Sequence, residues 1–284
     1  MKTMNTMIKL NDSDCYIETA PVSIDEYVQN AATHHTAGNY ERAIYWYTET
    51  LKLMPDISTG YVARGVCRNH TGDVIGALED LNIAIEMDPE NANAYHIRGF
   101  IYQFQGYQKN AIDDLTASLM INPHNSLAYA HRSISYEHEK NYEAAIADVT
   151  KYLNEAPDDK AMLFRRGLLY DLTKNSEGAR ADYEKLIELY PDSPHGYIGR
   201  AMLGMNTNDT GKIEYDLLKT LECDPSFVAA YYILGVHYLM QKNPDGLKYI
   251  VKARNLGVDV KDSDYLMLQH FAFSNQQQQQ EGEF

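Results

Sequence analysis

A constant interval between prolines is the feature that most constrains how this chain can fold. Each gap is 34 residues, and the prolines are Pro55, Pro89, Pro123, Pro157, Pro191 and Pro225. Tyrosines keep the same period at Tyr27, Tyr61, Tyr95, Tyr129, Tyr197, Tyr231 and Tyr265, with Leu163 at the one missing place. A fixed period of this length is typical of repeat proteins, in which each repeat buries its apolar face against the next. The sequence therefore predicts an array of similar repeats.

Within one period the pattern predicts a helix, a turn and a second helix. In residues 92–125, Tyr95 and Tyr102 fall on one face of the first helix, because their spacing follows the helical period. Gly106 then breaks that helix. Pro123 stops the second helix, since proline cannot continue a helix. The expected fold class is therefore all-α.

This pattern resembles the tetratricopeptide repeat family, whose motif places aromatic, small, alanine and proline positions within 34 residues. The small positions here are Ala31, Gly65, Gly99, Ser133, Gly167, Ala201 and Gly235. The alanine positions are Ala43, Ala77, Ala111, Ala145 and Ala179, continued by Ile213 and Leu247. The resemblance implies a right-handed superhelical solenoid of seven helix–turn–helix repeats. These repeats are residues 24–57, 58–91, 92–125, 126–159, 160–193, 194–227 and 228–259, and the sixth is the least regular.

The two ends of the chain depart from the repeat pattern. Residues 1–22 are polar and aperiodic, and we expect a flexible N-terminal arm. Ser23 and Glu26 have the spacing of a capping box, which predicts the start of the first helix. Residues 260–273 form one more amphipathic segment, interpreted as a helix that caps the last repeat or, alternatively, as a helix offered to a partner. The Gln-rich residues 274–284 are expected to be disordered.

Five repeats carry arginine where the family motif has leucine, and an aspartate follows 16 residues later each time. The pairs are Arg64 with Asp80, Arg98 with Asp114, Arg132 with Asp148, Arg166 with Asp182 and Arg200 with Asp216. The first and seventh repeats lack both residues, so we infer that each pair links the two helices of its own repeat. Losing one partner of such a buried pair costs roughly 3–5 kcal/mol. The alternative is a ladder of arginines for an acidic ligand, which the aspartates would already neutralise.

The resemblance also implies a concave groove lined by the first helix of each repeat. At the corresponding positions this chain is almost wholly apolar, and an exposed apolar stripe of that length usually marks a binding surface. The alternative is that superhelical coiling buries part of the stripe. The candidate groove residues are Val62, Val66, Asn69, His96, Phe100, Gln103, His131, Ile134, Phe164, Leu168, Ile198, Met202 and Tyr232.

Members of the family that bind the tails of chaperones clamp a terminal carboxylate with a lysine and an asparagine. This chain has Val28 and Ala32 at those two places in its first repeat, and no later repeat supplies the lysine and asparagine together. The sequence therefore argues against a carboxylate clamp. An extended or helical apolar segment suits the predicted groove better.

Histidines are numerous near the predicted groove, but their spacing does not predict a metal site. They are His35, His70, His96, His131, His138 and His195. Imidazoles can bind metal or respond to pH, yet the interpretation we favour is that they hydrogen-bond a ligand or water. No cofactor is expected. Sequence signatures of catalysis such as GxSxG, the P-loop and HExxH are absent, so the chain is not expected to be an enzyme.

Composition narrows the partners and the compartment. The net charge of −15 argues against nucleic acid and anionic membranes, since both need a basic surface. Cys15, Cys67 and Cys223 form no CxxC motif, which fits a reducing compartment. No signal peptide and no apolar stretch long enough to span a membrane is visible, so a cytoplasmic location is expected.

The leading functional hypothesis is a non-enzymatic scaffold or adaptor that holds a peptide or protein segment in the groove. Two alternatives stay open on the sequence alone. The chain could be a self-assembling structural protein, although its net charge opposes a homo-oligomer at low salt. It could also be an accessory subunit of an enzyme complex, because the groove would have the same sequence features.

Overall fold

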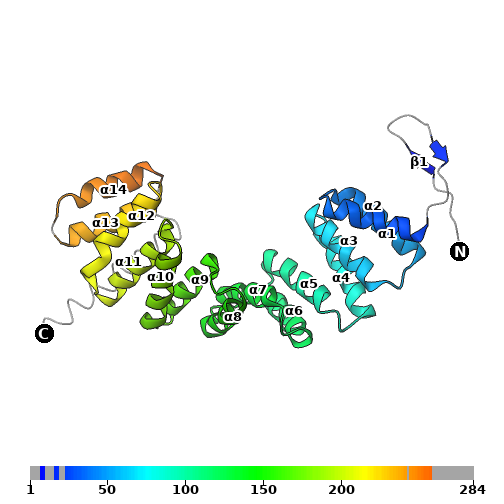
Figure 1. The fold of residues 1–284 in the computed structure, drawn as a ribbon, viewed down its shortest axis with the longest axis horizontal. Coiled ribbons are helices and arrows are strands. Elements are labelled where there is room, and N and C mark those ends of the chain that lie inside the picture. Colours follow the sequence, from blue (N-terminus) through cyan, green and yellow to red (C-terminus); the bar gives the residue numbers. More distant parts are fainter. Residues whose placement is uncertain (1–6, 10–15, 19–22, 242, 258–284) are drawn as a thin grey trace. The chain divides into compact units, whose positions relative to one another are not determined.

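The computed structural model describes residues 7–9, 16–18, 23–241 and 243–257 of the chain. This part contains fourteen α-helices, which confirms the all-α class, and they follow one another as seven pairs (Figure 1). The first helices of the pairs are α1 (Ile24–Thr36), α3 (Ser58–His70), α5 (Ala92–Phe104), α7 (Ser126–His138), α9 (Lys160–Leu172), α11 (Pro194–Thr207) and α13 (Val228–Met240). The second helices are α2 (Tyr40–Leu53), α4 (Val74–Met87), α6 (Gln108–Ile121), α8 (Tyr142–Glu155), α10 (Ser176–Leu189), α12 (Ile213–Cys223) and α14 (Gly246–Asn255).

The helices belong to two compact units. The N-terminal unit is Met1–Asn141 and contains α1 to α7. The C-terminal unit is Tyr142–Phe284 and contains α8 to α14. The repeat period predicted one continuous array and did not predict this division.

The same packing order recurs inside each unit. The two helices of a repeat pack together, and the second helix then packs on the first helix of the next repeat, as α2 does on α3 and α10 on α11. First helices of successive repeats also contact each other, namely α3 with α5, α5 with α7 and α9 with α11. Within the described residues, no two second helices are in comparably extensive contact. The first helices therefore form one continuous side of each unit, which we call its inner side.

A residue in the left-handed backbone conformation lies in the turn between the two helices of a repeat. Glycine takes this place in the first three repeats, at Gly38, Gly72 and Gly106, where φ is 73°, 85° and 82°. Glycine adopts such angles without a steric penalty. The next three repeats have Lys140, Lys174 and Asn208 in the same conformation. This turn geometry, which the repeats share, explains why Gly106 ends its helix as predicted.

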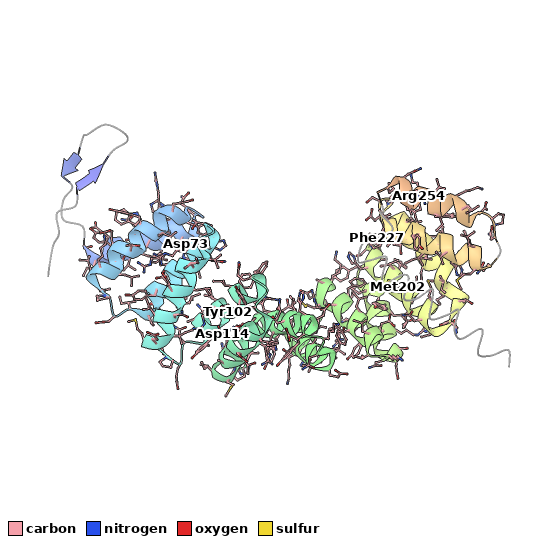
Figure 2. The ribbon with its side chains drawn as sticks, turned by 180° about the vertical axis from the view of Figure 1, so that it is seen from behind. Asp73, Tyr102, Asp114, Met202, Phe227 and Arg254 are labelled. Carbon is pink, nitrogen blue, oxygen red and sulfur yellow. The ribbon has the colours of Figure 1, made fainter. Side chains whose placement is uncertain are left out.

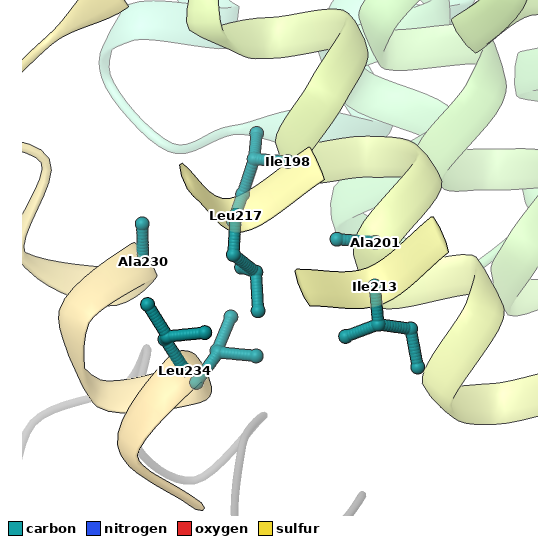
Figure 3. Packing of buried hydrophobic residues seen from close by; sticks show 7 residues of the cluster. Ile198, Ala201, Ile213, Leu217, Ala230 and Leu234 are labelled. Carbon is teal, nitrogen blue, oxygen red and sulfur yellow. The ribbon is translucent and has the colours of Figure 1, made fainter. Parts of the chain in front are cut away.

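Small residues lie where the helices approach most closely. The five periodic alanines, from Ala43 to Ala179, have no exposed surface. In the C-terminal unit the buried core continues as Ile198, Ala201, Ile213, Leu217, Ala230, Ile233 and Leu234, drawn from α11, α12 and α13 (Figure 3). Met202 and Phe227 pack against the edge of this core (Figure 2). The repeat period thus fixes the spacing of the core along the chain.

The ends and the sixth repeat show local departures. Ser23 and Glu26 form the predicted capping box at the start of α1. The sixth repeat, the least regular in sequence, inserts a short 3-10 helix at Thr210–Lys212 before α12. Strands β1 (Met7–Lys9) and β2 (Tyr16–Glu18) pair antiparallel, and the sequence did not predict them.

Three predictions about the ends remain untested. The flexibility of the arm at residues 1–22 stays a prediction. The expected capping helix at 260–273 and the tail at 274–284 lie outside the described residues.

Candidate functional site

Buried ion pairs link the two helices of a repeat. In four repeats the arginine Nε and Nη2 atoms donate to the two oxygens of one aspartate, over distances of 2.6–2.9 Å. The pairs are Arg64–Asp80, Arg98–Asp114, Arg166–Asp182 and Arg200–Asp216. All four aspartates are buried, and a buried carboxylate requires such a partner. These arginines are therefore not free to bind an acidic ligand.

In the fifth predicted pair, Arg132 and Asp148 belong to different units, so their pairing stays a prediction. The arginines also reach back 16 residues to the preceding second helix: Arg64 to Thr48, Arg98 to Asn82, Arg132 to Thr116, Arg166 to Thr150 and Arg200 to Glu184. These contacts were not predicted from the sequence, although the oxygen-bearing side chain at each of those places was a signal that could have indicated them.

Three predicted groove residues gather on the inner side of the N-terminal unit. The ring of Phe100 on α5 meets the ring of His131 on α7 edge to face, with centroids 4.7 Å apart. The His96 ring lies 5.4 Å from the His131 ring, and the Phe104 ring lies 4.8 Å from the Phe100 ring. Phe104 is 74% exposed. We call His96, Phe100, Phe104 and His131 the inner aromatic cluster.

The two imidazoles of the inner aromatic cluster are neutral at neutral pH. Burial, and then the neighbouring His96, lower the pKa of His131 to about 4. Burial also lowers the pKa of His96, whose Nε2 atom is buried and has no hydrogen-bond partner among the described residues. The cluster therefore presents an aromatic, uncharged surface, and its one unpaired polar atom is buried.

The other candidate residues of the N-terminal unit contribute less exposed surface. Val62 is only 5% exposed and belongs to the core, as the coiling alternative anticipated. Gln103 is also buried, whereas Val66, Asn69 and Ile134 are half-buried. None of these five side chains has a ring or hydrogen-bond contact with the inner aromatic cluster, so the candidates are not one uniform stripe.

A second group of rings lies at the start of the same unit. The His70 ring stacks on the Tyr40 ring with centroids 4.3 Å apart and planes 4° apart. His35 Nδ1 shares a hydrogen bond with the hydroxyl of Tyr47 at 3.1 Å. Burial, and then His70, lower the pKa of His35. Sequence analysis placed both histidines near the groove but did not identify their tyrosine partners.

In the C-terminal unit, Phe164 of α9 meets His195 of α11 edge to face at 5.1 Å. The hydroxyl of Ser193 shares a hydrogen bond with Nδ1 of His195 at 3.0 Å. Burial, and then the charge of Lys160, lower the pKa of His195. An open hollow of about 400 Å³ lies beside these residues, lined by Lys160, Leu189, Tyr190, Pro191, Asp192, Ser193, Pro194 and His195.

The remaining candidates of the C-terminal unit divide between core and inner surface. Ile198 is 2% exposed and belongs to the core, so it cannot contact a ligand as predicted without repacking. Phe164 and Met202 pack against that core and remain half-buried. Leu168 and Tyr232 are half-buried as well.

A polar group that sequence analysis missed lies at the C-terminal end of α9. The amide Nδ2 of Asn206 on α11 donates to Asp171 Oδ2 at 2.8 Å. Burial raises the pKa of Asp171, and the hydrogen bond from Asn206 lowers it by less. The fully buried ring of Tyr183 lies nearby, and its hydroxyl has no hydrogen-bond partner among the described residues. Asp171 is one residue type at one place in a single repeat, so the 34-residue period did not identify it.

The described residues show no metal centre and no membrane span. No three histidine, cysteine, aspartate or glutamate side chains gather there in a way that could hold a metal ion. Among the helices of residues 23–241 and 243–257, none is long and apolar enough to cross a membrane. Burial raises the pKa of Cys67 to about 11, so this thiol does not act as a nucleophile at neutral pH.

Family models identify the repeats. The model of the tetratricopeptide repeat matches residues 92–125, and a second model of the same repeat matches residues 161–193. The chain therefore contains tetratricopeptide repeats. Proteins built from this repeat are typically interaction modules without catalysis. A comparison with curated protein sequences gives no significant match.

Solved structures of tetratricopeptide repeat proteins share the fold. The C-terminal part of a repeat protein from Cytophaga hutchinsonii aligns with a TM-score of 0.68 and 18% identity, over 84% of this chain and 97% of that one. A protein from Parabacteroides merdae aligns with a TM-score of 0.59 and 19% identity, over 83% and 94%. YrrB, described as a repeat protein with an unusual peptide-binding site, aligns with a TM-score of 0.61 and 16% identity, over 65% and 95%.

Proposed function

We propose that this tetratricopeptide repeat protein is a non-enzymatic interaction module that binds a peptide or protein segment along its first helices. The inner aromatic cluster is the observation that carries the proposal. Aromatic rings at helix interfaces normally pack into the core, yet Phe104 extends this cluster into solvent. Aromatic side chains that become buried when a partner binds supply much of the binding energy in protein interfaces.

The chemistry of the inner aromatic cluster favours an apolar anchor on the partner. His96 and His131 are uncharged at neutral pH, so an apolar side chain can dock without desolvating a cation. The unpartnered Nε2 of His96 is buried, so the surface that the cluster offers to a partner is aromatic and apolar. The peptide-binding site of YrrB, a protein of the same fold, lends this proposal general support.

Site-specific photo-crosslinking tests where the partner binds. The photoreactive residue p-benzoylphenylalanine would replace either Phe104 on the inner side or Met120 on α6. Met120 is a suitable control because it is an apolar residue of the same unit and is 79% exposed. In lysate of the native cell, we expect a crosslinked partner from position 104 and none from position 120. Equal crosslinking from both positions would contradict binding on the inner side.

Affinity measurements then test the cluster itself. The crosslinked segment would be synthesised and its binding measured by fluorescence anisotropy against wild type, Phe100→Glu and Met120→Glu. We expect Phe100→Glu to weaken binding by about 2 kcal/mol, roughly 30-fold in Kd, and Met120→Glu to leave the Kd unchanged. Circular dichroism must show that both variants fold. A folded Phe100→Glu variant with unchanged affinity would refute the proposal.

A further inference from the structure

The inner side of the C-terminal unit carries one carboxylate on its first helices. Asp171 is the only acidic residue in α9, α11 and α13. It lies in the last turn of α9, where the backbone carbonyl groups add partial negative charge. The negative potential at this place therefore has two sources, the side chain and the helix end.

Asp171 differs from the buried carboxylates of its unit because no cation neutralises it. Asp182 and Asp216 each bind an arginine through both oxygens. Asp171 accepts one hydrogen bond, from the neutral amide of Asn206, and no basic side chain of the described residues forms an ion pair with it. Burial of this carboxylate without a cation raises its pKa. A half-buried carboxylate in this state gains free energy when a cation arrives.

A second unsatisfied group lies next to Asp171. The ring of Tyr183 enters from α10 between α9 and α11, passing Gly167 and Gly199 so closely that a Cβ atom at either glycine would lie about 2.5 Å from the ring. The residue is 0% exposed, and its hydroxyl has no hydrogen-bond partner in the described part of the chain. Burial, and then the charge of Asp171, raise the pKa of this hydroxyl. This buried hydroxyl cannot contact a ligand directly, and it donates no hydrogen bond to Asp171, so the carboxylate keeps acceptor capacity for another donor.

The surface beside the carboxylate is apolar. Phe164, Leu168 and Asp171 follow one another at spacings of four and three residues, which places them on one face of α9. Phe164 and Leu168 are half-buried, and the Phe164 ring lies 6.1 Å from the Tyr183 ring. Lysine and arginine side chains complement this arrangement, because each has an apolar stem that ends in a cationic head.

We infer that the segment bound by this protein carries a lysine or arginine, whose stem lies along Phe164 and Leu168 and whose head group donates hydrogen bonds to Asp171. The inference rests on the proposed function, because it names the chemistry of the segment that the first helices bind. The net charge of −15 acts in the same direction by attracting a basic segment to the chain.

Selection from a peptide library tests this inference even while the partner is unidentified. A phage library of random 16-residue peptides would be selected on wild type, on Asp171→Asn and on Asp192→Asn. Asparagine keeps the shape of Asp171 and can still accept the hydrogen bond from Asn206, so the variant is expected to fold. Asp192 is the matched control because it is an exposed carboxylate of the same unit, next to the N-terminal end of α11.

The expected result is a lysine or arginine at a fixed distance from apolar residues in the peptides selected by wild type and by Asp192→Asn. Peptides selected by Asp171→Asn should lack this preference. For one selected peptide, replacing the basic residue with glutamine should weaken binding to wild type about tenfold and leave binding to Asp171→Asn nearly unchanged.

Two outcomes would overturn the inference in distinguishable ways. Peptides that share only apolar residues, or a basic preference that persists in Asp171→Asn, would refute the role of Asp171 and leave the proposed function intact. A library that yields no binders, or binders equally retained by Phe100→Glu and Phe164→Glu, would refute the proposed function and the inference together.

Discussion

Tyr47 and Tyr183 occupy the same place in the repeat, four periods apart, and they meet different residues. In the N-terminal unit, the Tyr47 hydroxyl shares a hydrogen bond with His35. In the C-terminal unit, the residue equivalent to His35 is Asp171, and the Tyr183 hydroxyl has no hydrogen-bond partner among the described residues. The same backbone position thus supports a satisfied polar pair in one unit and an unsatisfied one in the other.

This contrast separates two kinds of information in a repeat protein. The repeat phase determines where a side chain lies, because each second helix packs between two first helices. The identity of the residue determines whether its polar atom finds a hydrogen-bond partner there. Buried groups without an internal partner destabilise a fold, so they are stronger candidates for a functional use than satisfied groups are.

Removing an arginine from a buried pair should produce the largest difference between the two units. Asp182 has Arg166 as its arginine partner, whereas Asp80 also binds Arg68 at 3.0 Å in addition to Arg64. We expect Arg166→Leu to cost about 3–5 kcal/mol and Arg64→Leu about 1–3 kcal/mol, because Asp80 keeps a cation. Hydrogen exchange read by mass spectrometry would report each unit separately. Equal losses in the two units would show that Arg68 does not compensate.

Filling the space that admits the ring of Tyr183 should have the next largest effect. A Cβ atom at Gly199 would lie 2.4 Å from Cε1 of Tyr183, so we expect Gly199→Leu to destabilise the C-terminal unit by about 1–3 kcal/mol. Tyr183→Leu should restore much of this loss, since Leu81 and Leu115 occupy the equivalent place in other repeats. Urea unfolding of the two single variants and the double variant measures the coupling. If the effects of the two substitutions are purely additive, the strain does not arise from contact between residue 199 and the ring of Tyr183.

Acid should act through His131 and through Asp171 with opposite sign. The folded pKa of His131, about 4, is below the value near 6.5 of an unfolded imidazole. The unfolded state therefore binds a proton first, and stability present above pH 6.5 is lost as the pH falls towards 4. We expect a loss of roughly 1–2 kcal/mol, less than the full shift implies because the ring is partly exposed. Asp171 has a raised pKa, so its protonation adds stability over the acidic range.

Two variants isolate these contributions. His131→Gln should reduce the acid-induced increase in hydrogen exchange of α5 and α7, although His96 keeps a similar dependence. Asp171→Asn should remove the stabilisation that acid gives to α9. Unfolding free energies of the N-terminal unit that are flat between pH 7 and 5 would contradict the pKa shifts of both histidines.

Much of the fold follows from the sequence because the residues that recur with the repeat period restrict the backbone. The prolines, small residues and Arg–Asp spacing each restrict local geometry, so their phase predicts helix pairs and the contacts within a pair. Burial along the inner side was harder to predict. Val62, Ile198 and Phe100 are all apolar and occupy groove positions, but only Phe100 reaches the inner aromatic cluster, because burial depends on the residues of neighbouring repeats.

The site in the C-terminal unit was hidden from sequence for a similar reason. Asp171 resembles a solvated surface carboxylate when it is considered alone. Its chemistry arises from Asn206 on the next repeat and from Tyr183, which two glycines admit between the helices. The only signal in the sequence was a tyrosine at a periodic core position that other repeats fill with leucine. Which residues this tyrosine contacts depends on how the helices pack.

Removing single hydroxyl groups should produce the smallest effect and the most direct test of the contrast. Tyr47→Phe deletes a hydrogen bond to His35, so we expect it to destabilise the N-terminal unit by about 0.5–1.5 kcal/mol. Tyr183→Phe deletes a buried hydroxyl without a partner, so it should leave the C-terminal unit unchanged or slightly more stable. The two changes are chemically identical, and urea unfolding measures both. If Tyr183→Phe proved as costly as Tyr47→Phe, the hydroxyl of Tyr183 would have to be satisfied in solution, and the positions of the two tyrosines would be equivalent in chemistry as well as in phase.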